Sequence, residues 1–316
     1  MLLTQSLLYI SFMRISYFGT PSFAVPILES LYNDDSIKIT SVVTQPDKPG
    51  NRNKITPPPV KIMAQELGVK IHQPNKIDAD FIEELEEESP DAIVVVAYGE
   101  IIPEELLDLP TFGCINVHPS LLPKYRGASP IQEAILNGDT ETGVSIMKLD
   151  EELDHGPIIL IKRVEISEDE NTEKLSAKLA IIAAEILPMA LQDIEDEFLT
   201  PIPQEHNKAT FCSKITKQDG EIDWKKTGKE ILNQVRALNP WPSTYTILKD
   251  KRVKISEIEI TKEEALEKPG TIKNLDKDNF GFYSKDSLII PKKLQVEGKS
   301  EMTTKEFLNG YKNLLD

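Results

Sequence analysis

Residues 91–98, Asp-Ala-Ile-Val-Val-Val-Ala-Tyr, indicate the fold of the first part of the chain. Their continuously apolar, β-branched run is typical of a strand that is buried on both faces of a parallel sheet. On either side of it, strand patterns alternate with helical ones: strands are expected at 14–18, 37–44, 69–72 and 114–118, and helices at 21–31, 60–67 and 78–88. This order predicts an α/β fold with a Rossmann-like, doubly wound parallel sheet.

The pattern changes after a long helix that is expected from 173 to about 198. Residues 200–204 (Thr-Pro-Ile-Pro-Gln) are polar and proline-rich, which is typical of a domain boundary. Beyond them, short alternating segments and one helix near 228–238 predict a smaller β-rich domain, an OB-like barrel. We therefore predict a Rossmann-like catalytic domain at 13–200, a linker at 201–212 and a β-barrel domain at 213–316.

Residues 1–12 precede the first expected strand and are interpreted as an extension, so Met13 is a candidate start of translation. The apolar runs are far shorter than the roughly 20 residues that span a bilayer, so no membrane segment is expected. The two cysteines, Cys114 and Cys212, cannot form a disulfide framework or a zinc cluster. They fit a reducing, cytoplasmic compartment and imply no metal.

Charge is distributed unevenly along the chain. The net charge is −16, from 36 basic and 52 acidic residues, which excludes a uniformly basic nucleic-acid binder. Residues 211–316, however, hold 20 basic and 17 acidic side chains, whereas residues 1–210 hold 16 and 35. The acidic total therefore leaves room for basic patches that could hold a phosphate backbone.

Asn116 and His118 are the first candidates for chemistry. They lie two residues apart on an expected strand, so their side chains point to the same side of the sheet, near the carboxyl end where open α/β sheets bind ligands. A carboxamide beside an imidazole could clamp a carbonyl oxygen that becomes an oxyanion. The alternative is that both side chains merely satisfy loop backbone.

Asp154 lies in the segment 150–157, a turn between two apolar strands. Acids before Gly-Pro are usually solvated turn formers. Beside Asn116 and His118, however, this carboxylate would complete a set of groups for proton transfer.

These residues resemble the motif of the 10-formyltetrahydrofolate-dependent formyltransferases. That motif is Asn-x-His, Ser-Leu-Leu-Pro, a basic-aromatic-Arg-Gly turn and then Leu-Asp-x-Gly, and all of it is present between residues 116 and 156. Narrower motifs resemble the methionyl-tRNA formyltransferases of that superfamily, and they run through both expected domains: Gly19–Pro26, Thr44–Pro49, Gly220–Trp224 and Asn239–Pro242.

The resemblance implies an enzyme that transfers the formyl group of 10-formyltetrahydrofolate, a co-substrate, to the α-amine of methionine on initiator methionyl-tRNA, for translation initiation. By position in the motif, Asn116 and His118 would hold the formyl oxygen, and Asp154 would keep His118 protonated and relay protons. No metal and no obligate protein partner is implied. The pterin would lie against backbone of the 151–154 loop and of two further segments: Ser120, Leu121, Leu122 and Pro123, and Val96, Ala97, Tyr98 and Gly99.

The resemblance also implies two contacts with tRNA. A basic loop at 47–61 would enter the acceptor end through Lys48, Arg52 and Lys54, although asparagines flank Arg52 where the family has glycines. The C-terminal domain would add a second patch: Lys249, Lys251 and Arg252. A basic surface loop that is only solvated is the alternative. Trp224 and Trp241 are expected to be buried anchors of the β-rich domain.

Two other interpretations stay open. Another enzyme of the superfamily, such as a sugar-nucleotide formyltransferase, would share the Asn-x-His and Asp set, but the basic loop, Asn239–Pro242 and the added β-rich domain favour the tRNA enzyme. The second alternative is a non-catalytic RNA-binding Rossmann protein. Gly19 is followed by Thr-Pro-Ser-Phe, so the Gly-x-Gly-x-x-Gly fingerprint of dinucleotide-binding proteins is not present there. This argues against a dinucleotide-binding protein of that kind.

Overall fold

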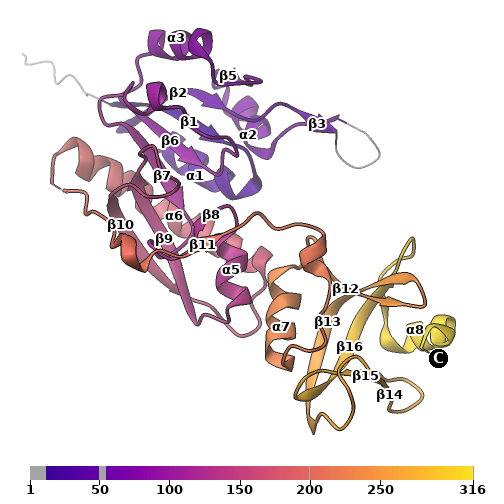
Figure 1. The fold of residues 1–316 in the computed structure, drawn as a ribbon. Helices are drawn as coiled ribbons and strands as arrows, with labels where there is room; N and C mark the ends of the chain where they lie inside the picture. The colour runs from indigo at the N-terminus through magenta and orange to yellow at the C-terminus, as the bar shows by residue number, and fades with distance from the viewer. Residues whose placement is uncertain (1–11, 50–54, 199, 316) are drawn as a thin grey trace, which may run out of the picture. The chain divides into compact units, whose positions relative to one another are not determined.

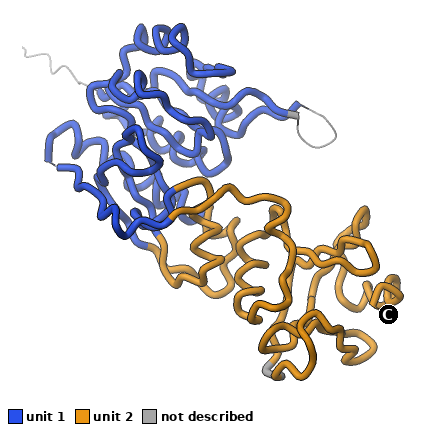
Figure 2. Tube along the Cα trace, in the orientation of Figure 1, with its two compact units in different colours: residues 1–126, 143–163, 177–210 blue, residues 127–142, 164–176, 211–316 orange. Residues whose placement is uncertain are grey.

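The computed structural model describes residues 12–49, 55–198 and 200–315, and the chain divides into two compact units (Figure 2). Unit 1 comprises residues 1–126, 143–163 and 177–210, and unit 2 comprises 127–142, 164–176 and 211–316. Two segments that precede residue 200, 127–142 and 164–176, therefore belong to unit 2. The contiguous domains expected at 13–200 and 213–316 stay a prediction.

A seven-stranded sheet is the centre of the first half of the chain, in the order β10-β9-β7-β6-β1-β2-β5 (Figure 1). Its strands are β1 (Met13–Gly19), β2 (Ile37–Val43), β5 (Ile71–His72), β6 (Ala92–Val96), β7 (Cys114–His118), β9 (Glu141–Lys148) and β10 (Ile158–Glu165). The pairs β1–β2, β1–β6, β2–β5 and β6–β7 are parallel, which confirms the α/β fold class.

β9 adds an antiparallel strand to this predominantly parallel sheet, because it pairs antiparallel with β7, with His118 opposite Ser145. A parallel neighbour needs a crossover connection, usually a helix packed on the sheet. The helix between β7 and β9 is α5 (Pro130–Leu136), and it belongs to unit 2. The chain therefore returns beside β7 in the opposite direction, and the sheet is mixed.

β6 confirms the expectation drawn from residues 91–98. All five of its residues are buried. Ile93 and Val95 pack in one cluster with Phe81 and Leu85 of α3 (Ala79–Glu87) and with Leu106 of α4 (Glu104–Leu107). The alternation of a strand places Ala92, Val94 and Val96 on the opposite face, so β6 is buried on both faces.

α6 (Thr172–Glu195) is the longest helix among the described residues and bears on the expectation about membrane segments. By length and composition alone it could cross a bilayer, since its most apolar window has a mean hydropathy of 1.5. The core helix of a soluble protein passes the same test, and Leu179, Ala183 and Leu187 form a buried stripe at helical spacing. Polar residues interrupt the apolar ones, so a search for continuous apolar runs misses this helix.

The remaining elements of the first 212 residues are short. Asp78 caps α3, accepting a hydrogen bond from the Phe81 amide at 3.2 Å. The other helices and strands are α1 (Val25–Tyr32), α2 (Pro59–Leu67), the pair β3 (Lys48–Pro49) and β4 (Ile55–Thr56), and the pair β8 (Arg126–Gly127) and β11 (Phe211–Cys212).

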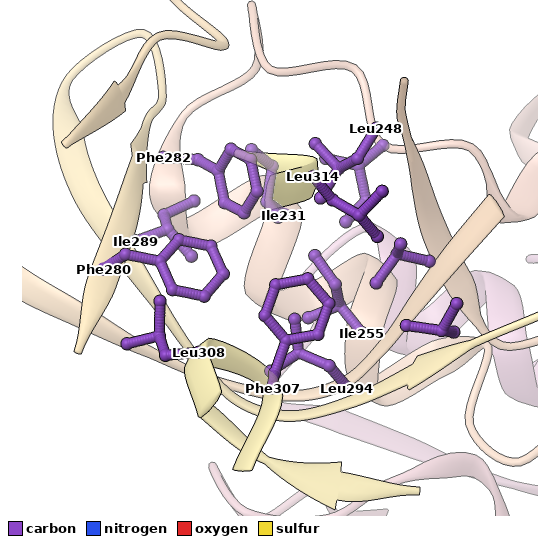
Figure 3. Close-up of a cluster of buried hydrophobic side chains, with 13 residues drawn as sticks. Ile231, Leu248, Ile255, Phe280, Phe282, Ile289, Leu294, Phe307, Leu308 and Leu314 are labelled. Carbon is purple, nitrogen blue, oxygen red and sulfur yellow. The ribbon is translucent and has the colours of Figure 1, made fainter. Parts of the chain in front are cut away.

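Unit 2 contains a six-stranded antiparallel sheet in the order β12-β13-β16-β15-β14, with β17 beside β16. Phe280, Phe282 and Leu294 of this sheet meet Ile231 of α7 and Phe307 of α8 in one core (Figure 3). The bounds are α7 (Gly228–Ala237), β12 (Thr244–Leu248), β13 (Lys251–Glu264), β14 (Ile272–Asn274), β15 (Phe280–Tyr283), β16 (Ser287–Val296), β17 (Met302–Thr303) and α8 (Thr304–Tyr311). The β-rich domain is confirmed, α8 is an addition, and closure as an OB-like barrel stays a prediction.

Candidate active site

The structure brings the three predicted catalytic residues together in unit 1. Asn116 and His118 lie on β7, and Asp154 lies in the turn between β9 and β10. The Asn116 Nδ2 donates to Asp154 Oδ1 at 3.3 Å, and the His118 Nδ1 lies 3.6 Å from Asp154 Oδ2. All three residues are buried, with 9%, 4% and 8% of their surfaces exposed. An amide, an imidazole and a carboxylate thus share one small, largely dry space.

The contact of the His118 Nε2 indicates which ring nitrogen of His118 carries a hydrogen. The Nε2 is 3.0 Å from the backbone oxygen of Tyr125. A carbonyl oxygen only accepts hydrogen bonds, so Nε2 must carry the proton in this contact. The Nδ1 then faces Asp154, and a further proton on Nδ1 would make this contact an ion pair.

Asp154 has an unusual backbone conformation. Its φ is 47°, in the left-handed region, where only glycine and, less readily, asparagine and aspartate are common. Residues held in such conformations cluster at functional sites and persist where the surroundings determine them.

Gln204 supplies part of those surroundings. Its Nε2 donates to the backbone oxygens of Asp154 at 2.9 Å and Gly156 at 2.8 Å, and its Oε1 accepts from Arg126. The sequence patterns did not single out Gln204, which lies among prolines at the predicted domain boundary, nor did they give Arg126 a role. Gln204 carries no local signal, because its partners are 48, 50 and 78 residues away along the chain, whereas Arg126 belongs to the basic-aromatic-Arg-Gly turn of the motif.

Ser120, Leu121, Leu122 and Pro123, predicted to bind folate, follow β7 directly. Ser145 of β9 holds this segment: its Oγ donates to the Ser120 oxygen at 2.7 Å and accepts from the Leu122 amide at 3.2 Å. The Ser120 hydroxyl donates to the Lys124 oxygen at 2.6 Å. Ser120 and Leu122 are buried, whereas Leu121 and Pro123 are partly exposed. Leu122 is therefore a packing residue, and the segment is fixed in place against β9.

Val96, Ala97, Tyr98 and Gly99, also predicted to bind folate, form the turn after β6. Ala97 and Gly99 are exposed and have positive φ values of 48° and 96°. The Tyr98 ring is only 2% exposed and packs edge-on against Phe18, and burial raises the pKa of its hydroxyl to about 12. Tyr98 is thus a neutral core residue, and only the backbone and small side chains of this turn are open to a ligand.

A cavity of about 350 Å³ adjoins the Asp154 turn. Glu151 and Glu152 of the predicted folate-binding loop lie on its wall, and so does Leu107 of α4. The wall also includes six further residues: Glu104, Asp108, Lys148, Leu149, Asp150 and His155. The predicted loop therefore borders an open space large enough for a ring system.

The predicted tRNA-binding loop is only partly described. Lys48 is exposed on β3, which pairs with β4 as a short hairpin, whereas Arg52 and Lys54 lie outside the described residues. At the base of the loop the Lys61 Nζ binds Asp47 at 2.8 Å. Hydrogen bonds from Lys61 and Gln73 hold the pKa of the Asp47 carboxyl below its ordinary value. The charge of Lys61 is therefore paired.

The second predicted tRNA patch lies on the β12–β13 hairpin of unit 2. Lys249 and Asp250 have φ values of 44° and 63°, as in the two-residue turns that join antiparallel strands. Lys249 and Lys251 are exposed there. The Arg252 guanidinium lies 3.4 Å from the centroid of the Tyr245 ring, a cation–π contact that fixes its position. All three residues thus lie at one hairpin, where Lys251 and Arg252, as consecutive strand residues, point to opposite faces.

The two tryptophans differ in burial. Trp224 stacks on Phe282 with 4.4 Å between ring centroids and packs against the core of unit 2, as expected. Trp241 is 55% exposed, so the expectation of a buried anchor is wrong there. The neighbouring Pro242 is buried.

A metal-binding cluster is not present in the part of the chain that the structure describes. Within it, no group of three or more His, Cys, Asp or Glu side chains is arranged to hold a metal ion.

Comparisons with known proteins match both halves of the chain to one family. Residues 13–191 match the formyl transferase family, and residues 214–312 match the formyl transferase C-terminal domain. The methionyl-tRNA formyltransferase of Caldicellulosiruptor saccharolyticus is 43% identical over 95% of this chain and 97% of its own length. That of Thermodesulfovibrio yellowstonii is also 43% identical, over 94% of this chain and 96% of its length.

Solved structures with the same fold are more distant in sequence. WlaRD, a sugar 3N-formyl transferase, has a TM-score of 0.65 at 21% identity, and the match covers 91% of this chain and 99% of WlaRD. HypX from Aquifex aeolicus in complex with tetrahydrofolic acid has a TM-score of 0.61 at 17% identity. That match covers 94% of this chain and 47% of HypX, so this chain spans about half of that protein. At these identities the likeness shows the fold alone.

Proposed function

Since this chain belongs to the formyltransferase family, we propose that it formylates the α-amine of methionine on initiator methionyl-tRNA for translation initiation. The observation that carries the proposal is the buried contact of Asn116, His118 and Asp154, together with relatives of the same length at 43% identity. 10-Formyltetrahydrofolate supplies the formyl group. The acceptor is the neutral amine of the aminoacyl-tRNA.

Asn116 and His118 stabilise the formyl oxygen as it gains negative charge. The Asn116 amide has two hydrogens, one directed at Asp154 and one left to donate to that oxygen. A proton on the His118 Nδ1 is the second donor, because the Nε2 hydrogen is already directed at Tyr125. Asp154, within reach of both, accepts the proton that the attacking amine must lose. That proton passes to N10 of the folate as the bond between N10 and the formyl carbon breaks, so tetrahydrofolate leaves as a neutral amine.

The folate co-substrate binds along the segments that surround these residues. Ser120–Pro123, Val96–Gly99 and the 151–154 loop offer backbone groups that can match the donor and acceptor edge of a pterin. The cavity of about 350 Å³ beside Glu151 and Leu107 supports this placement. The tRNA is held by Lys48, Arg52 and Lys54 and by the β12–β13 hairpin with Lys249, Lys251 and Arg252. The proposed enzyme is soluble and cytoplasmic, and it needs no obligate protein partner.

The function is tested by supplying 10-formyltetrahydrofolate with either methionyl-tRNA or a 4-amino sugar nucleotide and measuring formylated product. Product from the tRNA alone is expected. Formylation of the sugar alone would establish a sugar-nucleotide formyltransferase, and no product with either acceptor would favour a non-catalytic RNA-binding protein.

The site is tested by Asn116→Ala, His118→Ala and Asp154→Ala. Each is expected to leave the fold intact and to lower turnover about a hundredfold or more. His72→Ala is the matched control, because the His72 imidazole is also buried (7% exposed) and lies 2.7 Å from a carboxylate, that of Glu88. We expect His72→Ala to keep parental turnover. The loss of turnover in His118→Ala would then come from the site and not from the removal of any buried imidazole. Near-parental turnover in a site variant removes that residue from the mechanism.

A further inference from the structure

Gln204 uses its whole hydrogen-bonding capacity in unit 1. Its side chain is 5% exposed. The Oε1 accepts from Arg126 Nε at 3.1 Å and from Arg126 Nη2 at 2.7 Å. The two hydrogens of Nε2 go to the backbone oxygens of Asp154 at 2.9 Å and Gly156 at 2.8 Å. A primary amide can make four such bonds, and this one makes all four.

The orientation of that amide is set by Arg126. A guanidinium only donates hydrogen bonds, so the amide oxygen must face it and the amide nitrogen must face the Asp154 turn. Arg126 is 4% exposed and its Nη2 also lies 2.9 Å from His206 Nδ1. Arg126 therefore holds Gln204 in the one orientation in which both carbonyls of the turn receive a donor.

The turn needs this support. The two carbonyls that Gln204 binds enclose His155, and the first belongs to Asp154 itself, whose φ of 47° is a costly conformation. Conformations of this kind cost about 1–3 kcal/mol and persist only where surrounding contacts determine them. Two hydrogen bonds from one rigid amide fix the backbone on both sides of His155. The direction of the Asp154 side chain toward Asn116 and His118 follows from that backbone.

We propose that Gln204 is a positioning residue, which acts through Asp154 by holding its backbone in the left-handed conformation that aims the carboxylate at Asn116 and His118. This inference rests on the proposed function, because it assigns Gln204 to the same site. Gln204 does not contact the reacting groups. Its loss should therefore lower the rate of the chemical step and leave binding of the tRNA unchanged.

The test is Gln204→Glu, which has nearly the same shape and keeps the acceptor for Arg126 but turns the two donors into an oxygen facing two carbonyls. A displacement of about 1 Å at a reacting group can cost about a hundredfold in rate. We expect kcat to fall about tenfold to a hundredfold, with KM for methionyl-tRNA within about twofold of the parent. Gln204→Asn, which keeps the amide on a shorter side chain, is the second variant and should show the same split.

The matched control is Gln234→Glu in unit 2. Gln234 is also 5% exposed, and its Nε2 also donates to two backbone oxygens, those of Asp219 at 2.8 Å and Glu221 at 2.9 Å. This substitution imposes the same kind of local cost away from the site. The melting temperatures of Gln204→Glu and Gln234→Glu are measured, and all assays are run below the lower of the two. Gln234→Glu should lose thermal stability and keep parental kcat.

A double-mutant cycle with Asp154→Asn separates positioning from a general structural role. If Gln204 acts through the Asp154 carboxylate, Gln204→Glu should cost less than about twofold in kcat once that carboxylate is gone. An equal loss in both backgrounds would overturn the proposal. So would parental kcat in both Gln204 variants, or failure of both to fold, which would show that the whole unit needs Gln204. The parental protein is assayed in parallel, so absence of formyl transfer there would count against the proposed function and not against Gln204 alone.

Discussion

Ser145→Ala tests how the sheet fixes the segment after β7. Ser145 is fully buried, and its hydroxyl bridges the Ser120 carbonyl at 2.7 Å and the Leu122 amide at 3.2 Å. The substitution removes both bonds and leaves two buried backbone groups without this partner. A buried group that loses its partner costs about 1–3 kcal/mol, so the two together should lower the free energy of unfolding by about 2–6 kcal/mol.

The functional consequence follows from the place of the bridge. Ser120–Pro123 is a proposed wall of the folate site, so a looser segment should raise KM for 10-formyltetrahydrofolate several-fold, while KM for methionyl-tRNA stays the same. Chemical denaturation gives the first quantity and steady-state kinetics the second. Both are measured on purified parent and variant under the same conditions.

Ser16→Ala is the matched control in the same sheet. Ser16 is also fully buried, and its hydroxyl contacts another side chain, the Ser41 hydroxyl at 2.9 Å, between β1 and β2. We expect a smaller loss of stability, about 1 kcal/mol, and no change in KM. The reasoning is refuted if Ser145→Ala unfolds within about 0.5 kcal/mol of the parent, or if both variants raise KM for folate alike.

Two further predictions concern a buried thiol and the proposed tRNA patch. Burial raises the pKa of the Cys114 thiol to about 12, so a thiol reagent at pH 8 should not modify Cys114 until the protein unfolds. The raised pKa also means that the free energy of unfolding should fall as pH rises from about 9 toward 12, because the thiol ionises first in the unfolded state. Cys114→Ala should flatten that part of the profile of stability against pH. An unchanged profile in this variant would contradict the assignment. Lys251→Ala should weaken binding of initiator and elongator tRNAs alike and reduce the slope of log K against log salt by about one, measured by filter binding, whereas a slope equal to that of the parent would remove Lys251 from the patch.

Local patterns were sufficient for most elements of the fold. The apolar run at 91–98 became β6, the segment 114–118 became β7, and the helix expected near 228–238 is α7. Such elements are readable because side-chain periodicity and burial reflect contacts within a few residues of chain. The antiparallel β9 was not readable, because strand direction in a sheet depends on where the intervening α5 packs, which is a tertiary property.

The candidate site divides in the same way. The sequence by itself determined that Asn116 and His118 share one side of a strand end, because the period of a β-strand is two residues. Only the tertiary structure placed Asp154, 38 residues further along, against Asn116, and joined Ser145, Arg126 and Gln204 to the segments around them. These contacts join residues 23 to 78 positions apart where the chain folds back on itself, as in the bonds of Ser145 to Leu122 and of Arg126 to Gln204, and no local pattern encodes them. A polar residue in a linker and one that holds a buried turn look the same in sequence, because the difference is the set of partners that the fold brings within 3 Å.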